Sequence, residues 1–132
     1  MTMREALVTS SAPSAIGPYS QGIRSGRLVF TSGQLPMTPS GELISEDIAR
    51  AARRSLQNVM AVLGEAGGTA QDVVKVTIFL SDLADFGAVN EVYGEFFAEP
   101  YPARSCVQVA KLPKDARIEI EATACIDDTL PS

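Results

Sequence analysis

The sequence contains no histidine and no tryptophan among its 132 residues. Without histidine the chain cannot build a Ser-His-Asp triad or a Cys-His pair, and it lacks the commonest metal-ligating side chain. Any acid-base chemistry must therefore use carboxylates, tyrosine, cysteine, lysine or water. The sequence also lacks a P-loop, a GxGxxG motif and a cluster of metal ligands, so nothing in it supports nucleotide or metal chemistry.

Positive charge and long apolar runs are scarce as well. The 11 Lys+Arg are outnumbered by 16 Asp+Glu, and a net charge of -5 repels phosphate backbones, so we expect no nucleic-acid partner. No apolar run approaches the roughly 20 residues of a membrane span, so we expect no membrane partner. The opening MTMREALVTS has no signal-peptide core, and the two cysteines, Cys106 and Cys125, fall in apolar strand-like runs. We therefore expect a reduced, cytoplasmic protein.

The length fits one domain that spans residues 1–132. Apolar residues recur every three or four positions in two segments, which predicts two amphipathic helices. The first begins at Ser45, a good N-cap residue, and ends about five turns later at the glycines 67–68. The second begins near Asp85 and ends before Pro100.

Strands are predicted at 28–31, 73–80, 104–109 and 117–126, with one more strand before the first helix. The run VVKVTIFL, 73–80, is nearly continuous in apolarity, which is typical of a central strand buried on both faces. The element order favours an α+β fold with two helices on one face of a sheet. Because two helices cover only one face, we expect a second subunit of a homo-oligomer to cover the other.

The last two strands carry the residue types that suit chemistry. Period-two alternation puts Arg104, Cys106 and Gln108 on one side of their strand and Glu119 and Glu121 on one side of theirs. If the two strands pair as a hairpin across residues 112–115, an arginine, a thiol and carboxylates line one surface.

Arg104 is suited to hold a carboxylate because its planar fork donates two parallel charge-assisted hydrogen bonds. The alternative is an ion pair between Arg104 and a glutamate on a solvated sheet face. Glu119 has apolar neighbours that raise the pKa of a carboxyl, which would let it exchange protons near neutral pH. The alternative there is an ordinary amphipathic strand.

Five further candidate residues are weaker when each is taken alone. Cys106 can be a nucleophile only if Arg104 stabilises its thiolate; otherwise it is a half-buried filler. Tyr19 follows a Gly-Pro turn that can project its phenol into a pocket, or the turn is an ordinary one. Ser32 and Gly33 lie in a bend that can present donors to an anion, or in a plain loop. Asn90 lies one residue from the apolar stripe of the second helix. Its side chain can reach a pocket at the helix edge, or it is simply hydrated.

Several stretches taken together resemble one family, in order and nearly end to end over residues 8–125. They are SAIGPYSQG, FTSGQLP, the LQNV helix, VVKVTIFLSDLADFGAVNEVY, PARSCVQVAKLPKD and IEIEA. The chain is similar to the RidA/YjgF family of reactive-intermediate (imine/enamine) deaminases. Two segments depart from the family pattern: FFAEPYPARS is a few residues short and TPSGE one residue short.

The resemblance implies a chorismate-mutase-like α+β fold with about six strands in a mixed sheet and two helices on one face. It implies a homotrimer with clefts between subunits, no cofactor, and hydrolysis of 2-aminoacrylate, 2-iminopropionate and related imino acids to 2-oxo acids and ammonia. By this resemblance Arg104 binds the substrate carboxylate and Glu119 positions or activates water. The cleft would be lined by Tyr19, Ser32, Gly33, Asn90 and Cys106.

A second hypothesis uses the same residues. A carboxylate anchor also suits a trimer that binds or senses a small 2-oxo or amino acid without turning it over. Ribonuclease activity, attributed to some relatives, is disfavoured by the charge of -5 and the absence of histidine.

Overall fold

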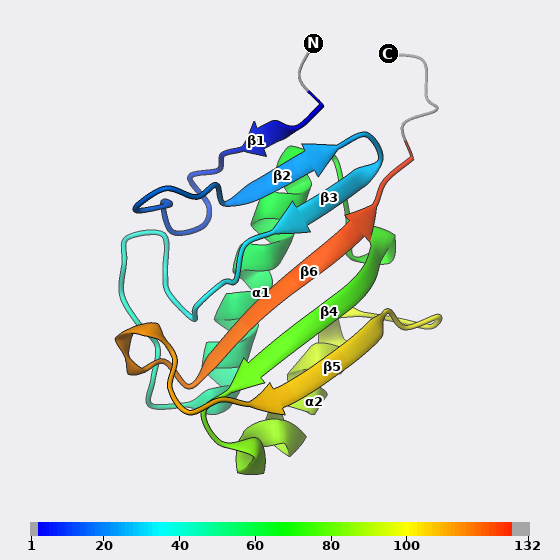
Figure 1. Cartoon of the computed structure of the whole chain (residues 1–132). Helices are drawn as coiled ribbons and strands as arrows, with labels where there is room; N and C mark the ends of the chain where they lie inside the picture. Colours follow the sequence, from blue (N-terminus) through cyan, green and yellow to red (C-terminus); the bar gives the residue numbers. More distant parts are fainter. Residues whose placement is uncertain (1–2, 128–132) are drawn as a thin grey trace.

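A computed structural model describes residues 3–127 of the chain. Its strands form one sheet, in the order β1-β2-β3-β6-β4-β5, and both long helices lie on the same side of it (Figure 1). The strands are β1 Glu5–Leu7, β2 Gly22–Ser25, β3 Leu28–Thr31, β4 Val73–Leu80, β5 Ala103–Gln108 and β6 Ile118–Cys125. The helices are α1 Ile48–Glu65 and α2 Phe86–Phe96, with short 3-10 turns η1 Ala70–Asp72, η2 Leu83–Asp85 and η3 Pro113–Asp115. The α+β fold with about six strands is confirmed.

Helix α1 begins later than the sequence predicts. Asp47, not Ser45, is its N-cap: the Asp47 backbone is extended, and its Oδ1 accepts from the Ala49 and Arg50 N–H groups at 2.9 and 3.3 Å. Ser45 lies two residues too early for its side chain to serve the first turn. Leu56, Val59 and other residues of the apolar stripe of α1 are fully buried, as the periodicity predicts.

The last two strands, β5 and β6, do not pair as a hairpin. β5 pairs in parallel with β4, and β6 pairs antiparallel with the other edge of β4, so β4 separates the two strands. The physical reason is the connection: parallel neighbours need a crossover, and α2 supplies it between β4 and β5. The loop after β5 must then pass β4 to reach the free edge on its far side.

The sheet has one covered face and one open face. Val76, Ile78 and Leu80 of β4 point toward the helices and are fully buried, and Ile118 and Ile120 of β6 lie beside them. The two helices therefore cover one face, as predicted. The same alternation turns the intervening residues, including Phe79 and Glu119, to the face without helices.

An apolar patch lies on the open face. It consists of Leu28 and Phe30 of β3 and Val107 of β5, which are 43%, 41% and 42% exposed, with half-buried Phe79 of β4. We refer to these four residues as the open-face patch. The registers place Leu28 and Phe30 at one end of this face and Phe79 and Val107 at the other, with polar Glu121 and Thr123 of β6 between the two pairs. Apolar pairs left exposed on a sheet face fit a surface that another chain covers.

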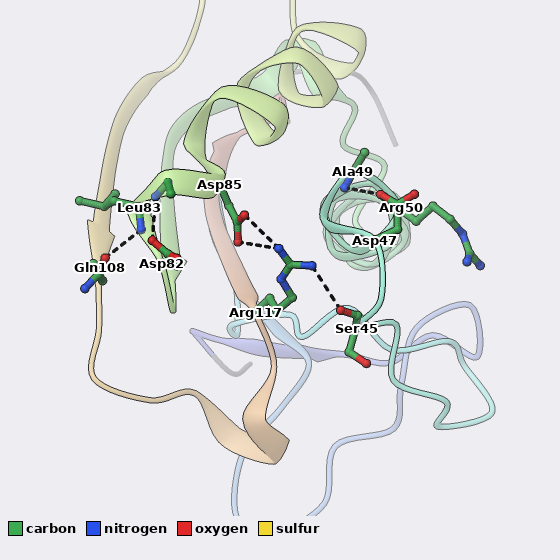
Figure 2. A network of polar contacts seen from close by, with 10 residues as sticks. Ser45, Asp47, Ala49, Arg50, Asp82, Leu83, Asp85, Gln108 and Arg117 are labelled. Carbon is green, nitrogen blue, oxygen red and sulfur yellow. Dashed lines mark hydrogen bonds and ion pairs between the residues drawn. The ribbon is translucent and has the colours of Figure 1, made fainter.

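A polar junction joins three elements at one end of the sheet. Figure 2 shows the guanidinium of Arg117, just before β6, donating to both carboxylate oxygens of Asp85 at 2.9 and 3.0 Å. It also donates to the Ser45 carbonyl oxygen at 3.4 Å. Because Asp85 is the last residue before α2, this ion pair fixes the entry of α2 against the start of β6.

Within residues 3–127, no helix is long and apolar enough to cross a bilayer.

Candidate active site in two halves

The first half of the candidate site surrounds Arg104 on β5. The Arg104 Nη1 donates to the Asn90 side-chain oxygen at 2.8 Å, so the predicted pair Arg104 and Asn90 does come together. Both line a hollow of about 450 Å³ with Tyr93, Gly94, Tyr101 and Pro102. No carboxylate among residues 3–127 pairs with Arg104. The proposed alternative, an ion pair with a glutamate of the same sheet, is therefore absent from the described chain.

The second half lies around Glu119 on β6. A hollow of about 490 Å³ is lined by Tyr19, Ser32, Gly33 and Glu119, so four of the residues predicted to share a cleft do share one. Its wall also includes apolar Ile16, Leu35 and Met37, together with Pro113 and Lys114. The hollow thus joins one carboxyl group, a phenol and an apolar wall.

The two halves lie on opposite faces of the sheet. Arg104 stands in the row of Val76 and Ala122, which face the helices, whereas Glu119 stands in the row of Phe79, on the open face. The two hollows share no lining residue. One chain therefore carries an arginine half-site and a glutamate half-site that do not face each other.

The environment of Glu119 suits proton transfer. Burial raises the pKa of the Glu119 carboxyl, and the charge of neighbouring Glu121 raises that pKa further, as the apolar neighbours predict. Gly33 lies directly against this carboxyl: a Cβ at Gly33 would be 2.5 Å from Glu119 Oε2. The absence of a side chain at Gly33 is what allows the loop to approach the carboxyl group.

Ser32 and Tyr19 are positioned by the segment before β2. The Ser32 hydroxyl donates to the Ser20 carbonyl oxygen at 2.6 Å, and the Ser32 N–H donates to the Gln21 carbonyl oxygen at 2.9 Å. The Ser32 hydroxyl proton is therefore engaged with Ser20, while the hydroxyl oxygen can still accept a hydrogen bond from a ligand. Tyr19 is 53% exposed at the rim of the hollow.

Sequence reasoning missed Gln21, a buried residue that organises this wall. Its side-chain amide nitrogen donates to the carbonyl oxygens of Thr9 and Pro13 at 3.1 and 2.7 Å, and its oxygen accepts from the Thr9 N–H at 2.8 Å. These bonds hold residues 9–13 beside the glutamate half-site. The sequence around Gln21 does not indicate these hydrogen bonds, because they depend on residues 9–13 folding back against Gln21.

Cys106 lies two residues from Arg104 on the same side of β5 but does not line the hollow. It packs against the hydrophobic core and lines neither hollow. Burial raises the pKa of the Cys106 thiol, and the nearby Arg104 charge offsets only part of that effect. The thiol therefore stays protonated near neutral pH, which disfavours the nucleophile and favours the half-buried filler.

Two aromatic residues on the apolar stripe of α2 were not predicted to lie at the site. Phe86 and Tyr93 both lie against the Arg104 guanidinium. Phe86, Asn90 and Tyr93 are spaced by four and three residues, which puts all three on one face of α2. The spacing alone does not show that this face meets Arg104, because that depends on β5 lying beside β4. In the described range 3–127, no three His, Cys, Asp or Glu side chains gather as metal ligands.

Comparison with known proteins identifies the family of the chain. The sequence profile of the family described as Endoribonuclease L-PSP matches residues 9–126. The chain belongs to the Endoribonuclease L-PSP family. A curated relative from Salmonella typhimurium LT2, named 2-iminobutanoate/2-iminopropanoate deaminase, is 50% identical over 125 residues, 92% of this chain and 98% of the relative.

Solved structures within the Endoribonuclease L-PSP family have the same fold. Escherichia coli TdcF with bound serine is 50% identical with a TM-score of 0.88, over 93% of this chain and 99% of that one. The Escherichia coli yjgF gene product is 50% identical with a TM-score of 0.87, over 92% and 98%. The resemblance to the RidA/YjgF family is confirmed, with its fold.

Proposed function

We propose that this chain hydrolyses small 2-imino acids, such as 2-iminopropanoate and 2-iminobutanoate, to 2-oxo acids and ammonia. The observation that carries the proposal is Arg104, an exposed guanidinium held at a small hollow with no carboxylate of the described chain to neutralise it. A free planar fork is suited to a substrate carboxylate. The curated relative with the deaminase name supports the same reaction.

We propose that the active form is a homotrimer whose clefts lie between neighbouring subunits. The open-face patch supports a covering subunit, and the separation of the two half-sites supports a shared cleft. Each cleft then takes Arg104 and Asn90 from one subunit and Tyr19, Ser32, Gly33 and Glu119 from its neighbour. The two free cysteines fit a reduced cytoplasm.

The reaction needs one water and no cofactor. Arg104 holds the carboxylate, which places the adjacent imine carbon opposite Glu119. In its ionised form Glu119 accepts a proton from the attacking water as the new C–O bond forms. With the protonated imine as substrate, Glu119 then returns that proton to the amine nitrogen of the intermediate. As the C–N bond breaks, the hydroxyl proton of the intermediate passes to Glu119, and ammonia and the 2-oxo acid leave. The raised pKa of Glu119 suits this double role, because the carboxyl changes protonation state closer to neutral pH.

The family is named after an endoribonuclease, but we do not propose that activity for this chain. RNA binding relies on Lys and Arg to neutralise phosphates, and here the net charge is -5. The sequence also has no histidine to act as the acid or base of strand cleavage.

The decisive experiment follows ammonia release from freshly generated 2-iminopropanoate, with wild type beside Arg104→Ala and Arg104→Lys. We expect both variants to lose about 100-fold or more of kcat/KM, because lysine cannot reproduce the bidentate fork. Sedimentation should show the wild-type assembly in each variant. Arg53→Ala, which removes an exposed arginine paired with Glu95 on the helix layer, is the matched control and should keep full activity.

An active Arg104→Ala would remove the anchor role. A folded wild type that binds 2-oxo acids saturably without accelerating hydrolysis would favour the sensing alternative over the deaminase.

A further inference from the structure

The Arg104 guanidinium rests on two aromatic rings of the neighbouring helix. Its central carbon, Cζ, lies 5.1 Å from the ring centroid of Phe86 and 4.7 Å from that of Tyr93. Both distances are within the range of cation–π attraction, which Arg forms more often than Lys. With Asn90 at 2.8 Å, three side chains of α2 therefore contact one guanidinium.

These contacts constrain the guanidinium in different directions. The rings oppose its movement toward the helix, and the Asn90 oxygen engages one of its N–H groups and so opposes rotation. The other N–H groups remain able to donate toward the hollow that Arg104 lines. An arginine on an edge strand, otherwise exposed and mobile, is thereby set in one orientation before a carboxylate arrives.

Tyr93 is itself fixed in place. It is 4% exposed, and its ring packs on Phe97 with centroids 4.5 Å apart. Its hydroxyl is buried and has no hydrogen-bond partner within the described chain. Burial raises the pKa of the Tyr93 phenol, so the group stays neutral and forms no phenolate pair with Arg104. The ring of Tyr93, and not its hydroxyl, is therefore what Arg104 contacts.

We propose that Tyr93 and Phe86 are positioning residues: together they form an aromatic platform that orients Arg104 to receive the substrate carboxylate. This inference rests on the proposed function, because the platform acts only through the anchor. It assigns a role to two residues that the apolar stripe of α2 alone presents as ordinary core.

The test compares Tyr93→Phe with Tyr93→Leu. The first removes only the unpartnered hydroxyl and keeps the ring; the second removes the ring. The kinetics of 2-iminopropanoate hydrolysis give kcat and KM, and NMR titration with 2-oxopropanoate gives a Kd that needs no catalysis. We expect Tyr93→Leu to raise both KM and Kd by about tenfold, and Tyr93→Phe to raise them by far less, because the ring that contacts Arg104 stays in place.

The kcat of Tyr93→Leu should stay within about threefold of wild type, because the carboxylate is held alike in the ground state and the transition state. A merely structural role would instead lower the active fraction, and hence kcat, at unchanged KM. Phe86→Leu, at a half-buried position, is the second variant and decides the matter if Tyr93→Leu does not fold. It should raise KM and Kd by about threefold.

The outcomes separate the two proposals. If wild type hydrolyses the imine and the ring-deleted variants keep its KM and Kd, the platform is wrong and the deaminase stands. If wild type binds 2-oxopropanoate without hydrolysing the imine, and Tyr93→Leu weakens that binding, the platform stands and the deaminase is wrong. Equal losses in Tyr93→Phe and Tyr93→Leu would give the role to the hydroxyl and overturn the platform.

Discussion

Glu119 is the residue at which stability and chemistry oppose each other. Its raised pKa means that the folded protein holds a proton that the unfolded chain has already released. The favourable contribution to folding is therefore complete below the ordinary pKa of a glutamate. It is lost as the pH rises through the raised pKa of the folded state, so at neutral pH the ionised carboxylate costs stability.

The variant Glu119→Gln tests this opposition. The amide cannot ionise or transfer a proton, so we expect kcat to fall by about 100-fold or more. Removing the buried charge should make the variant more stable than wild type at neutral pH and equally stable near pH 4. Ammonia release and thermal unfolding at several pH values measure the two effects.

Glu121→Gln is the matched control, because Glu121 is exposed two residues away on the same face. It should remain active and should shift the acid limb of the pH–rate profile to lower pH, since the Glu121 charge helps to raise the Glu119 pKa. A Glu119→Gln variant with wild-type kcat would show that water needs no help from this carboxyl.

At the scale of elements, the start of α1 offers a direct test of the N-cap. Asp47→Ala removes the side-chain acceptor of two backbone N–H groups, so it should lower the free energy of unfolding by about 1 kcal/mol. Ser45→Ala should change that free energy by less than about half as much, because the junction with Arg117 uses only the Ser45 backbone. Urea unfolding compares the two variants, and a larger loss for Ser45→Ala would return the cap to Ser45.

Local sequence patterns predicted most helices and strands well, but they did not predict which strands lie side by side in the sheet. The apolar stripe of α1 and the side of β5 that bears Arg104 both follow from periodicity within one segment. The placement of β6 does not, because it depends on α2 carrying the chain across to β5 and leaving the far edge of β4 open. Three strands precede α1 where two were predicted, and only 28–31 was given bounds; β1 and β2 have three and four residues, and so short a run has no measurable alternation.

The candidate site shows the same division. Residue types and the family resemblance selected Arg104 and Glu119, but only a hairpin of the last two strands would have put them on one surface of one chain, and those strands do not pair. Their true separation is a property of sheet order, which no local pattern records. The platform under Arg104 was hidden for the same reason, since Tyr93 has the same periodicity as a core residue.

At the scale of the whole molecule, mixing two inactive variants tests the shared cleft. Arg104→Ala retains a complete glutamate half-site, and Glu119→Gln retains a complete arginine half-site. In trimers that assemble from equal amounts of the two, about a quarter of the clefts should combine the intact halves, by the statistics of random mixing around a closed ring. Co-refolded mixtures should therefore recover about a quarter of wild-type activity.

The control mixes Arg104→Ala with the double variant Arg104→Ala/Glu119→Gln, which can form no intact cleft and should stay inactive. If mass spectrometry shows mixed trimers of the two single variants but no activity returns, Arg104 and Glu119 do not combine across subunits.

The placement of the two hollows on opposite faces has a consequence for dilution. If the cleft is shared between subunits as proposed, a lone chain can be fully folded and still contain no complete cleft, only one half of each of two. Specific activity would then depend on protein concentration, and would fall once the protein is diluted below the dissociation constant of its assembly. At a low concentration, an inert small carboxylate that bridges the two halves would fill some clefts and favour assembly while other clefts stay free. A weak inhibitor would therefore first activate a dilute sample and inhibit it only at a higher concentration.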